Sequence, residues 1–212
     1  MPRPKIVKET RREVEEREPP SRADIRPHDW LSEESAELYR RAANRDGPFD
    51  LYLSWLSKEK ITDHALKEAP KRLEVMGFLL GEVFTWNGQQ YALVRDVVTT
   101  NLKSSSAKVR FDPAAFPRLF NKLDGSGFDY ILVGWYHSHP GHTCFLSRTD
   151  LETQRTMFSQ EYHSAVVIDP LNKNIKAFKL DGVGYREVPF AVLGQGVHKV
   201  RRTRRLKTEP LN

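Results

Sequence analysis

The stretch ILVGWYHSHPGHTCFLSRTD, residues 131–150, decides the interpretation of the whole chain. Its apolar run from Ile131 to Tyr136 is typical of a strand buried on both faces. Side chains alternate along a strand, so His137 and His139, which follow at once, point to the same side. A Pro-Gly pair then ends the strand. The sequence therefore predicts two imidazoles side by side at the end of a buried strand.

A second pair of polar residues, Ser147 and Asp150, follows at the spacing Ser-x-x-Asp, ahead of a helical pattern that runs to about residue 160. On its own, this pair predicts an ordinary helix-capping box. A carboxylate in the first turn of that helix is also a candidate third ligand for a metal held by the two imidazoles. Two histidines and one carboxylate leave a fourth zinc position open for water, as in catalytic zinc sites. The combination indicates a zinc ion held by His137, His139 and Asp150.

The pattern His-x-His-Pro, followed after six residues by Ser-x-x-Asp, resembles the signature of the JAMM (MPN+) zinc metalloproteases. The flanking sequences GWYHSHPG (residues 134–141) and VVIDP (residues 166–170) are most similar to the deubiquitinases of the proteasome lid. The family also carries a glutamate far upstream, and Glu74 in the segment EVMGFLLG (residues 74–81) fits that place. Without the resemblance, nothing in the sequence favours Glu74 over Glu68 or Glu82.

The resemblance assigns roles to the five matching residues. His137, His139 and Asp150 would hold one zinc ion, Glu74 would accept the proton of the attacking water, and Ser147 would steady the oxyanion. The two other residues with reactive side chains near the motif are Cys144 and His142. We expect Cys144 to be packed behind the loop, and His142 to lie in a loop that touches substrate or solvent.

The fold expected from the resemblance is α+β, an MPN (JAMM) domain over residues 49–192 with a mixed curved β-sheet flanked by helices. The residue patterns agree, because strands in hairpins alternate with a few helices and without a repeating unit. Asn87-Gly88 predicts a two-residue hairpin turn. Helices are expected over 58–69, with Ser57 as the N-cap, over 112–123 and over 150–160. Strands are expected over 51–55, 74–83, 91–100, 131–139, 163–168, 175–180 and 183–188.

Two charged segments flank this domain. Residues 1–48 form a charged N-terminal extension with one helix near 32–45, and within it residues 1–29 read as a flexible arm with a short helix around 9–18. Residues 193–212 form a basic tail, with six Lys or Arg and one Glu from Lys199 onward. The tail is either a disordered solubilising segment or an arm that docks on an acidic partner. It lacks interleaved aromatic residues, which argues against nucleic acid as the partner.

The cysteine count and the lack of long apolar runs exclude several classes of protein. The chain has 212 residues and a single Cys, so it forms no intramolecular disulfide and no cysteine-based zinc knuckle. A deaminase is excluded for the same reason, because its zinc site needs a Pro-Cys-x-x-Cys pair. No run of 18 apolar residues and no secretory signal is present, so we expect a cytoplasmic protein without a membrane partner.

Three functions follow from the resemblance. The first is a zinc-dependent isopeptidase or peptidase that hydrolyses the bond after the C-terminal glycine of a ubiquitin-like protein, with membership of the proteasome or another protein complex left open. The second is a processing peptidase for sulfur-carrier-like relatives of ubiquitin. The third is a non-catalytic MPN scaffold that binds protein partners. For the first two, residues 100–111 are expected to flank the groove that receives the substrate tail.

Overall fold

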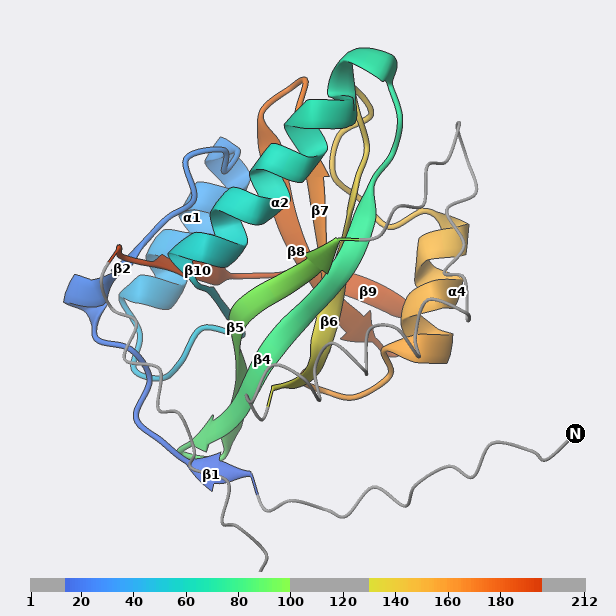
Figure 1. Ribbon diagram of the computed structural model, residues 1–212. Helices are drawn as coiled ribbons and strands as arrows, with labels where there is room; N and C mark the ends of the chain where they lie inside the picture. The colour runs from blue at the N-terminus through green and yellow to red at the C-terminus, as the bar shows by residue number, and fades with distance from the viewer. Residues whose placement is uncertain (1–13, 100–129, 196–212) are drawn as a thin grey trace, which may run out of the picture.

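The computed structural model describes residues 14–99 and 130–195 (Figure 1). Its helices are α1 (Glu33–Ala43), α2 (Trp55–Glu68) and α4 (Arg148–Met157), with the 3-10 turns η1 (Arg22–Asp24) and η2 (Ala69–Lys71). Its strands are β1 (Glu15–Glu16), β2 (Ile25–Arg26), β3 (Leu51–Leu53), β4 (Met76–Trp86), β5 (Gln89–Thr99), β6 (Ile131–Ser138), β7 (Ser164–Asp169), β8 (Asn174–Asp181), β9 (Gly184–Val188) and β10 (Phe190–Leu193).

The strands form one mixed sheet in the order β2-β10-β3-β5-β4-β6-β7-β8-β9, and β1 pairs with β4 beside this path. Strand β3 runs parallel to both of its neighbours, and β6 runs parallel to β7, whereas the β4–β5 and β4–β6 pairs are antiparallel. The expected hairpin turn joins β4 to β5, with positive φ angles of 49° at Asn87 and 78° at Gly88. The α+β class predicted from the sequence is confirmed.

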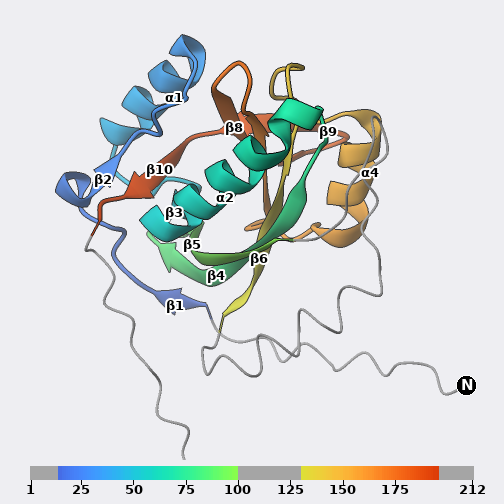
Figure 2. The same cartoon turned by 45° about the horizontal axis from the view of Figure 1, so that its top comes forward.

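Two hydrophobic cores lie on opposite faces of the central strands. Helix α2 covers one face, where Ile61 and Ala65 pack with side chains such as Val133 and Tyr136. Helix α4 leads into the other core through Phe158, which packs with Trp135 and its neighbours on β4, β7 and β8. Both views show α2 lying across the sheet and α4 beside β9 (Figures 1 and 2). Because side chains alternate along β6, the residue after Tyr136 faces the α4 side.

The N-terminal segment from residue 14 onward is part of the sheet. For residues 14–29, the expectation of a flexible arm was therefore wrong. Glu15–Glu16, expected in a short helix, form β1 and pair in parallel with Phe84 and Thr85. Ile25, in β2, pairs with Leu193 of β10 and is buried. Both strands cover sheet edges whose backbone N–H and C=O groups would otherwise lack partners. Helix α1 lies where the sequence predicts it, with Ser32 as its N-cap.

The start of α2 differs from the prediction. Ser57 was expected to cap a helix that begins at Lys58, but Ser54 is the cap and accepts a hydrogen bond from the Ser57 amide at 3.1 Å. Strand β3 therefore ends at Leu53, before Trp55. Either serine is a suitable cap in sequence terms, and Ser54 takes the role because its hydroxyl also bonds the Arg95 carbonyl of the neighbouring strand at 3.0 Å.

Several predictions fall outside the described residues. These are the helix over 112–123, the groove segment over 100–111 and the basic tail from residue 196 onward. The boundary between extension and domain at residues 48 and 49 stays a prediction. Strand β10 was not predicted, and its pairing with β3 and β2 joins the end of the domain to the N-terminal segment.

Candidate metal centre

His137 and His139 stand at the end of β6 with their side chains together. The two Nε2 atoms are 3.1 Å apart, and both residues are buried. The amide of His139 donates to the Ile168 carbonyl at 2.9 Å, which continues the pairing of β6 with β7 past the last strand residue. The backbone of both histidines is thus fixed by the sheet, as a preformed site requires.

Asp150 completes the cluster from the first turn of α4. Its Oδ2 atom lies 3.4 Å from Nε2 of His137 and 3.6 Å from Nε2 of His139. The same Oδ2 accepts the Ser147 amide hydrogen at 2.8 Å, and the Ser147 hydroxyl accepts from the Asp150 amide at 3.2 Å. Ser147 and Asp150 thus form a complete capping box, and the cap itself turns the carboxylate toward the imidazoles.

These three donor atoms suit a zinc ion. Zinc bonds to imidazole nitrogen and carboxylate oxygen are about 2.0–2.2 Å long, so two ligand atoms of a tetrahedral site lie roughly 3.3–3.6 Å apart. The two separations from Asp150, 3.4 and 3.6 Å, fall in this range, and the 3.1 Å between the imidazoles is slightly shorter. In the described part of the chain, His137, His139 and Asp150 are the group of side chains placed to share one ion.

Protonation states within the cluster favour metal binding. Burial lowers the pKa of His137, and the neighbouring Asp150 carboxylate only partly opposes this effect, so the imidazole is neutral at pH 7. For Asp150, burial acts to raise the pKa, but the contacts with His137 and His139 outweigh it and hold the pKa below the usual range. A neutral imidazole and an ionised carboxylate are the forms that coordinate a metal.

The orientation of the His139 ring is set by a backbone carbonyl. Its Nδ1 atom lies 3.3 Å from the Thr143 carbonyl oxygen, which only accepts hydrogen bonds. Nδ1 therefore carries the hydrogen and Nε2 presents its lone pair to the cluster. His137 has no such partner among the described residues, because its Nδ1 is buried and unbonded.

His137 is instead fixed by ring stacking. It lies against Trp135 with ring centroids 4.5 Å apart and ring planes 12° from parallel. The Trp135 indole N–H donates to Gln154 of α4 at 2.6 Å, and the Gln154 amide donates to the Phe158 carbonyl at 2.9 Å. This chain of contacts ties β6 to the helix that carries Asp150.

Glu74 stands half-buried just before β4, close to the histidine pair. Met76 pairs with His137 in the antiparallel β4–β6 ladder, so the same register continued by two residues puts Glu74 opposite His139. Two hydrogen bonds of 2.9 Å between Val75 and Ser138 hold this part of the register. The Glu74 carboxylate also contributes, as the smallest of the named effects, to the pKa of His137.

The two glutamates that the sequence could not separate from Glu74 have other contacts. Glu68 forms an ion pair with Lys71 at 3.0 Å. Glu82 forms one with Arg95 at 2.6 Å. Among the described residues, Glu74 has no ion-pair partner, so its carboxylate is available beside the cluster.

The remaining residues of the motif region occupy the periphery. Cys144 is buried, as expected, and burial raises its pKa to about 12, so it is a thiol rather than a nucleophilic thiolate. His142 is exposed and outside the cluster. Phe145, which the sequence did not single out, is 40% exposed and its ring centroid lies 4.8 Å from that of His139. An aromatic side chain two residues before the capping serine is the signal that was available in the sequence.

Comparison with known proteins identifies the family. The family model described as JAB1/Mov34/MPN/PAD-1 ubiquitin protease matches residues 51–162, more than half of the chain. The chain belongs to this family. The resemblance to JAMM (MPN+) proteins, and to the proteasome-lid subunit among them, is therefore confirmed.

One curated relative of this MPN protein is a proteasome subunit by name, and another is named as a ubiquitin carboxyl-terminal hydrolase. A 26S proteasome non-ATPase regulatory subunit 14 from Dictyostelium discoideum is 37% identical over 124 residues, covering 57% of this chain and 39% of the relative. The Saccharomyces cerevisiae protein named ubiquitin carboxyl-terminal hydrolase RPN11 is 33% identical over 144 residues, covering 63% and 44%. The chain thus spans less than half the length of these relatives.

A solved structure has a similar fold. The solution structure of protein DSY2949 from Desulfitobacterium hafniense superposes with a TM-score of 0.54 at 21% identity, covering 68% of this chain and 94% of that one. In the described part of the MPN protein, no helix combines the length and apolar character needed to cross a membrane.

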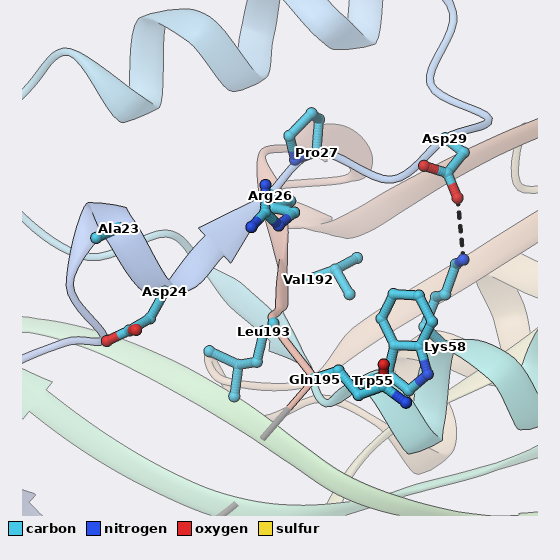
Figure 3. Close-up of a pocket in the computed structure, with 11 residues that line it drawn as sticks. Ala23, Asp24, Arg26, Pro27, Asp29, Trp55, Lys58, Val192, Leu193 and Gln195 are labelled. Carbon is cyan, nitrogen blue, oxygen red and sulfur yellow. Dashed lines mark hydrogen bonds and ion pairs between the residues drawn. The ribbon is translucent and has the colours of Figure 1, made fainter. Parts of the chain in front are cut away.

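A cavity of about 390 Å³ lies away from the metal centre of the MPN protein, between the N-terminal segment, the first turn of α2 and the end of β10 (Figure 3). Asp29 and Lys58, which both line the cavity, form an ion pair at 3.0 Å. The Lys58 ammonium also lies over the Trp55 ring, 4.7 Å from its centroid. None of the predicted site residues lines it. Its charged groups are of both signs and are partly paired with each other, so the cavity does not indicate a ligand.

Proposed function

We propose that this chain is a zinc-dependent isopeptidase or peptidase that hydrolyses the bond after the C-terminal glycine of a ubiquitin-like protein. The observation that carries the proposal is the set of buried donor atoms of His137, His139 and Asp150 at separations suited to tetrahedral zinc. The names of the curated relatives, which include a ubiquitin carboxyl-terminal hydrolase, support the same activity.

The three ligands divide the work of holding the ion. When bound, zinc supplies a Lewis acid that polarises the scissile carbonyl and makes water acidic enough to attack near neutral pH. His137 and His139 would contribute nitrogen donors to the ion and Asp150 one negative charge. Two histidines and one carboxylate are a ligand set found in catalytic zinc sites.

Glu74 is the proposed general base. Opposite His139 in the strand register, its carboxylate takes the proton of the attacking water and passes it to the leaving amine. This transfer balances the hydrolysis, because one proton of the water reaches the leaving amine through Glu74 and the second stays on the new glycine carboxyl group, from which it passes to the released amine or to solvent. The charge of Glu74 is free for the task, since no described residue pairs with it.

Ser147 is the proposed oxyanion donor. Its oxygen already accepts the Asp150 amide hydrogen, so the position of the side chain is fixed by the helix cap. In the free protein the hydroxyl also bonds the Asp150 side chain; in the proposed reaction its hydrogen is donated instead to the oxyanion of the tetrahedral intermediate. Removing one such donor typically costs about 100- to 1000-fold in rate.

The proposed substrate is an extended C-terminal tail that ends in glycine. Glycine lets a backbone approach a recessed ion closely, and buried ligands such as His137 make close approach necessary. We also propose membership of the proteasome or another protein complex, which the name of one relative supports, and a cytoplasmic setting.

Cleavage of a ubiquitin-like protein with a C-terminal extension tests the proposal. The wild type, Glu74→Gln and a chelator-treated sample are compared, with zinc measured in each. We expect cleavage after the terminal glycine by the wild type alone, with zinc retained in Glu74→Gln. The sulfur-carrier alternative predicts that only fusions of sulfur-carrier-like proteins are cut. The scaffold alternative predicts no stoichiometric zinc and no cleavage of any fusion.

A further inference from the structure

Asp169, the last residue of β7, is fully buried and joins two loops at the metal centre. Its Oδ1 accepts the amide hydrogens of Gly141 at 2.8 Å, Leu171 at 3.1 Å and Asn172 at 3.2 Å. Its Oδ2 accepts the Thr143 amide hydrogen at 2.9 Å and the Asn172 side-chain amide at 2.7 Å. Five N–H donors converge on one carboxylate, and two of them belong to the loop that follows His139.

That loop has an unusual backbone which needs support. Gly141 has a φ of 84°, and Thr143, which is not a glycine, has a φ of 65°. A β-branched residue in the left-handed region is strained, so outside contacts must hold it there. Within the described part of the chain, the Asp169 carboxylate is what bonds the amides of both residues.

The conformation of Thr143 determines the state of a metal ligand. Its carbonyl faces Nδ1 of His139 at 3.3 Å and keeps the hydrogen on that nitrogen. The contacts run from the Asp169 carboxylate to the Thr143 amide, through the Thr143 peptide to its carbonyl, and from there to the His139 ring. The backbone of His139 is held separately, by the carbonyl of Ile168, the residue before Asp169.

We infer that Asp169 is a positioning residue that fixes the tautomer and orientation of His139, and thereby the affinity of the centre for zinc. The inference rests on the proposed function insofar as it takes His139 to be a zinc ligand. Groups that orient metal-ligating histidines typically change metal affinity by about 10- to 100-fold when mutated. Asp169 acts through one intervening peptide, so the lower end of this range, about 10-fold, is expected.

Asp169→Asn is the informative variant. Asparagine has nearly the same shape but only one acceptor oxygen, so it cannot serve both sets of N–H donors. Asp50→Asn is the matched control, because Asp50 is also a buried carboxylate, its ion pairs are with Lys179 at 3.2 Å and Arg186 at 3.7 Å, and it does not touch the centre. Asn172→Ala is a second control, since it removes one donor on the far loop and leaves the Thr143 contact in place.

Three measurements on the full chain separate positioning from a purely structural role. Long-range ¹H–¹⁵N NMR of the zinc-free protein reports the His139 tautomer, chelator competition gives the zinc Kd, and urea unfolding gives stability. We expect Asp169→Asn to lose the single Nδ1–H tautomer and to bind zinc about 10-fold more weakly. We expect Asp50→Asn to lose stability without either change.

The inference is overturned if Asp169→Asn keeps the wild-type tautomer of His139. It is also overturned if Asp169→Asn and Asp50→Asn lose equal stability and their zinc Kd values change by the same factor. A wild type that binds no zinc would contradict the proposed function instead. In that case the tautomer measurement on the zinc-free chain still decides whether Asp169 positions His139.

Discussion

The Asp150 carboxylate accepts the amide hydrogen of Ser147 at 2.8 Å with the same oxygen that faces the two imidazoles. The helix cap and the candidate metal site therefore share an atom. A helix that is correctly capped places its carboxylate at the end of β6 without further adjustment. The two roles that the Ser-x-x-Asp spacing suggests, a helix cap and a metal ligand, are therefore compatible in this structure.

Replacing Asp150 by Asn separates these two roles. The Asn side-chain oxygen can still accept the Ser147 amide hydrogen, so α4 should remain folded, with a far-UV circular dichroism spectrum like that of the wild type. The lost negative charge and ligand atom should weaken zinc binding by more than the roughly 100-fold seen for groups outside the ligand shell. Wild-type zinc affinity in Asp150→Asn would contradict the assignment of this ligand.

Ser147→Ala should reduce both stability and rate. Loss of the N-cap should cost about 1 kcal/mol in the free energy of unfolding. Loss of the oxyanion donor should lower kcat about 100- to 1000-fold with KM little changed. Ser32→Ala is the control, because Ser32 caps α1 through the Ser35 amide at 3.3 Å, away from the centre. Equal kcat values in the two variants would remove Ser147 from the reaction.

The N-terminal segment should contribute to the stability of the domain. Ile25 is 6% exposed and packs in a further cluster of buried side chains, apart from the two central cores, with residues such as Phe49 and Leu193. Ile25→Ala should therefore lower the free energy of unfolding by about 2–5 kcal/mol. Val183→Ala, at a position that is 92% exposed, should change it by less than about 0.5 kcal/mol. Similar urea midpoints for both variants would show that this segment does not pack on the sheet.

Stability should fall in mild acid because of a buried histidine, His28. Burial, together with the charge of Lys58 and against that of Asp29, lowers its pKa from 6.5 to about 4. In the unfolded chain, His28 becomes protonated as the pH falls through 6.5, whereas in the folded chain it stays neutral until about pH 4. The free energy of unfolding is therefore unaffected by the titration of His28 above pH 6.5. It falls by up to about 3 kcal/mol between pH 6.5 and 4.

Urea unfolding at pH 7 and pH 4.5 measures this effect. His28→Phe keeps an aromatic ring beside Trp30 and Phe190 but removes the titrating group. The loss of stability between the two pH values should be smaller in His28→Phe than in the wild type. His163, whose pKa is also lowered to about 4 by burial, remains in both proteins and contributes equally to both. Identical losses in the two proteins would exclude His28 as a source of acid sensitivity.

Features coded by local sequence could be predicted. The apolar run of β6, the Asn87-Gly88 turn and the capping box at Ser147 each depend on residues a few positions apart, and all three are present in the structure. The same holds for the pairing of His137 with His139, which follows from strand alternation alone. Only the resemblance drew attention to Glu74, because its place opposite His139 depends on a strand pairing between distant segments.

Features that depend on distant partners were missed. Strands β1 and β2 have two residues each, too few to show any periodicity, and exist because they cover open sheet edges. The role of Asp169 was also invisible, because an Asp-Pro pair after a strand predicts a turn equally well without a buried network. The N–H groups that bond its carboxylate come from distant residues such as Gly141, 28 positions earlier, as well as from the turn that follows Asp169.

Zinc K-edge X-ray absorption of the protein loaded with one equivalent of zinc tests the central claim most directly. We expect a four-coordinate spectrum with two imidazole nitrogens and oxygen ligands at about 2.0–2.2 Å. In His139→Ala the imidazole contribution should fall from two rings to one. An all-oxygen coordination shell in the wild type, or a spectrum unchanged in His139→Ala, would contradict a metal centre built from His137, His139 and Asp150.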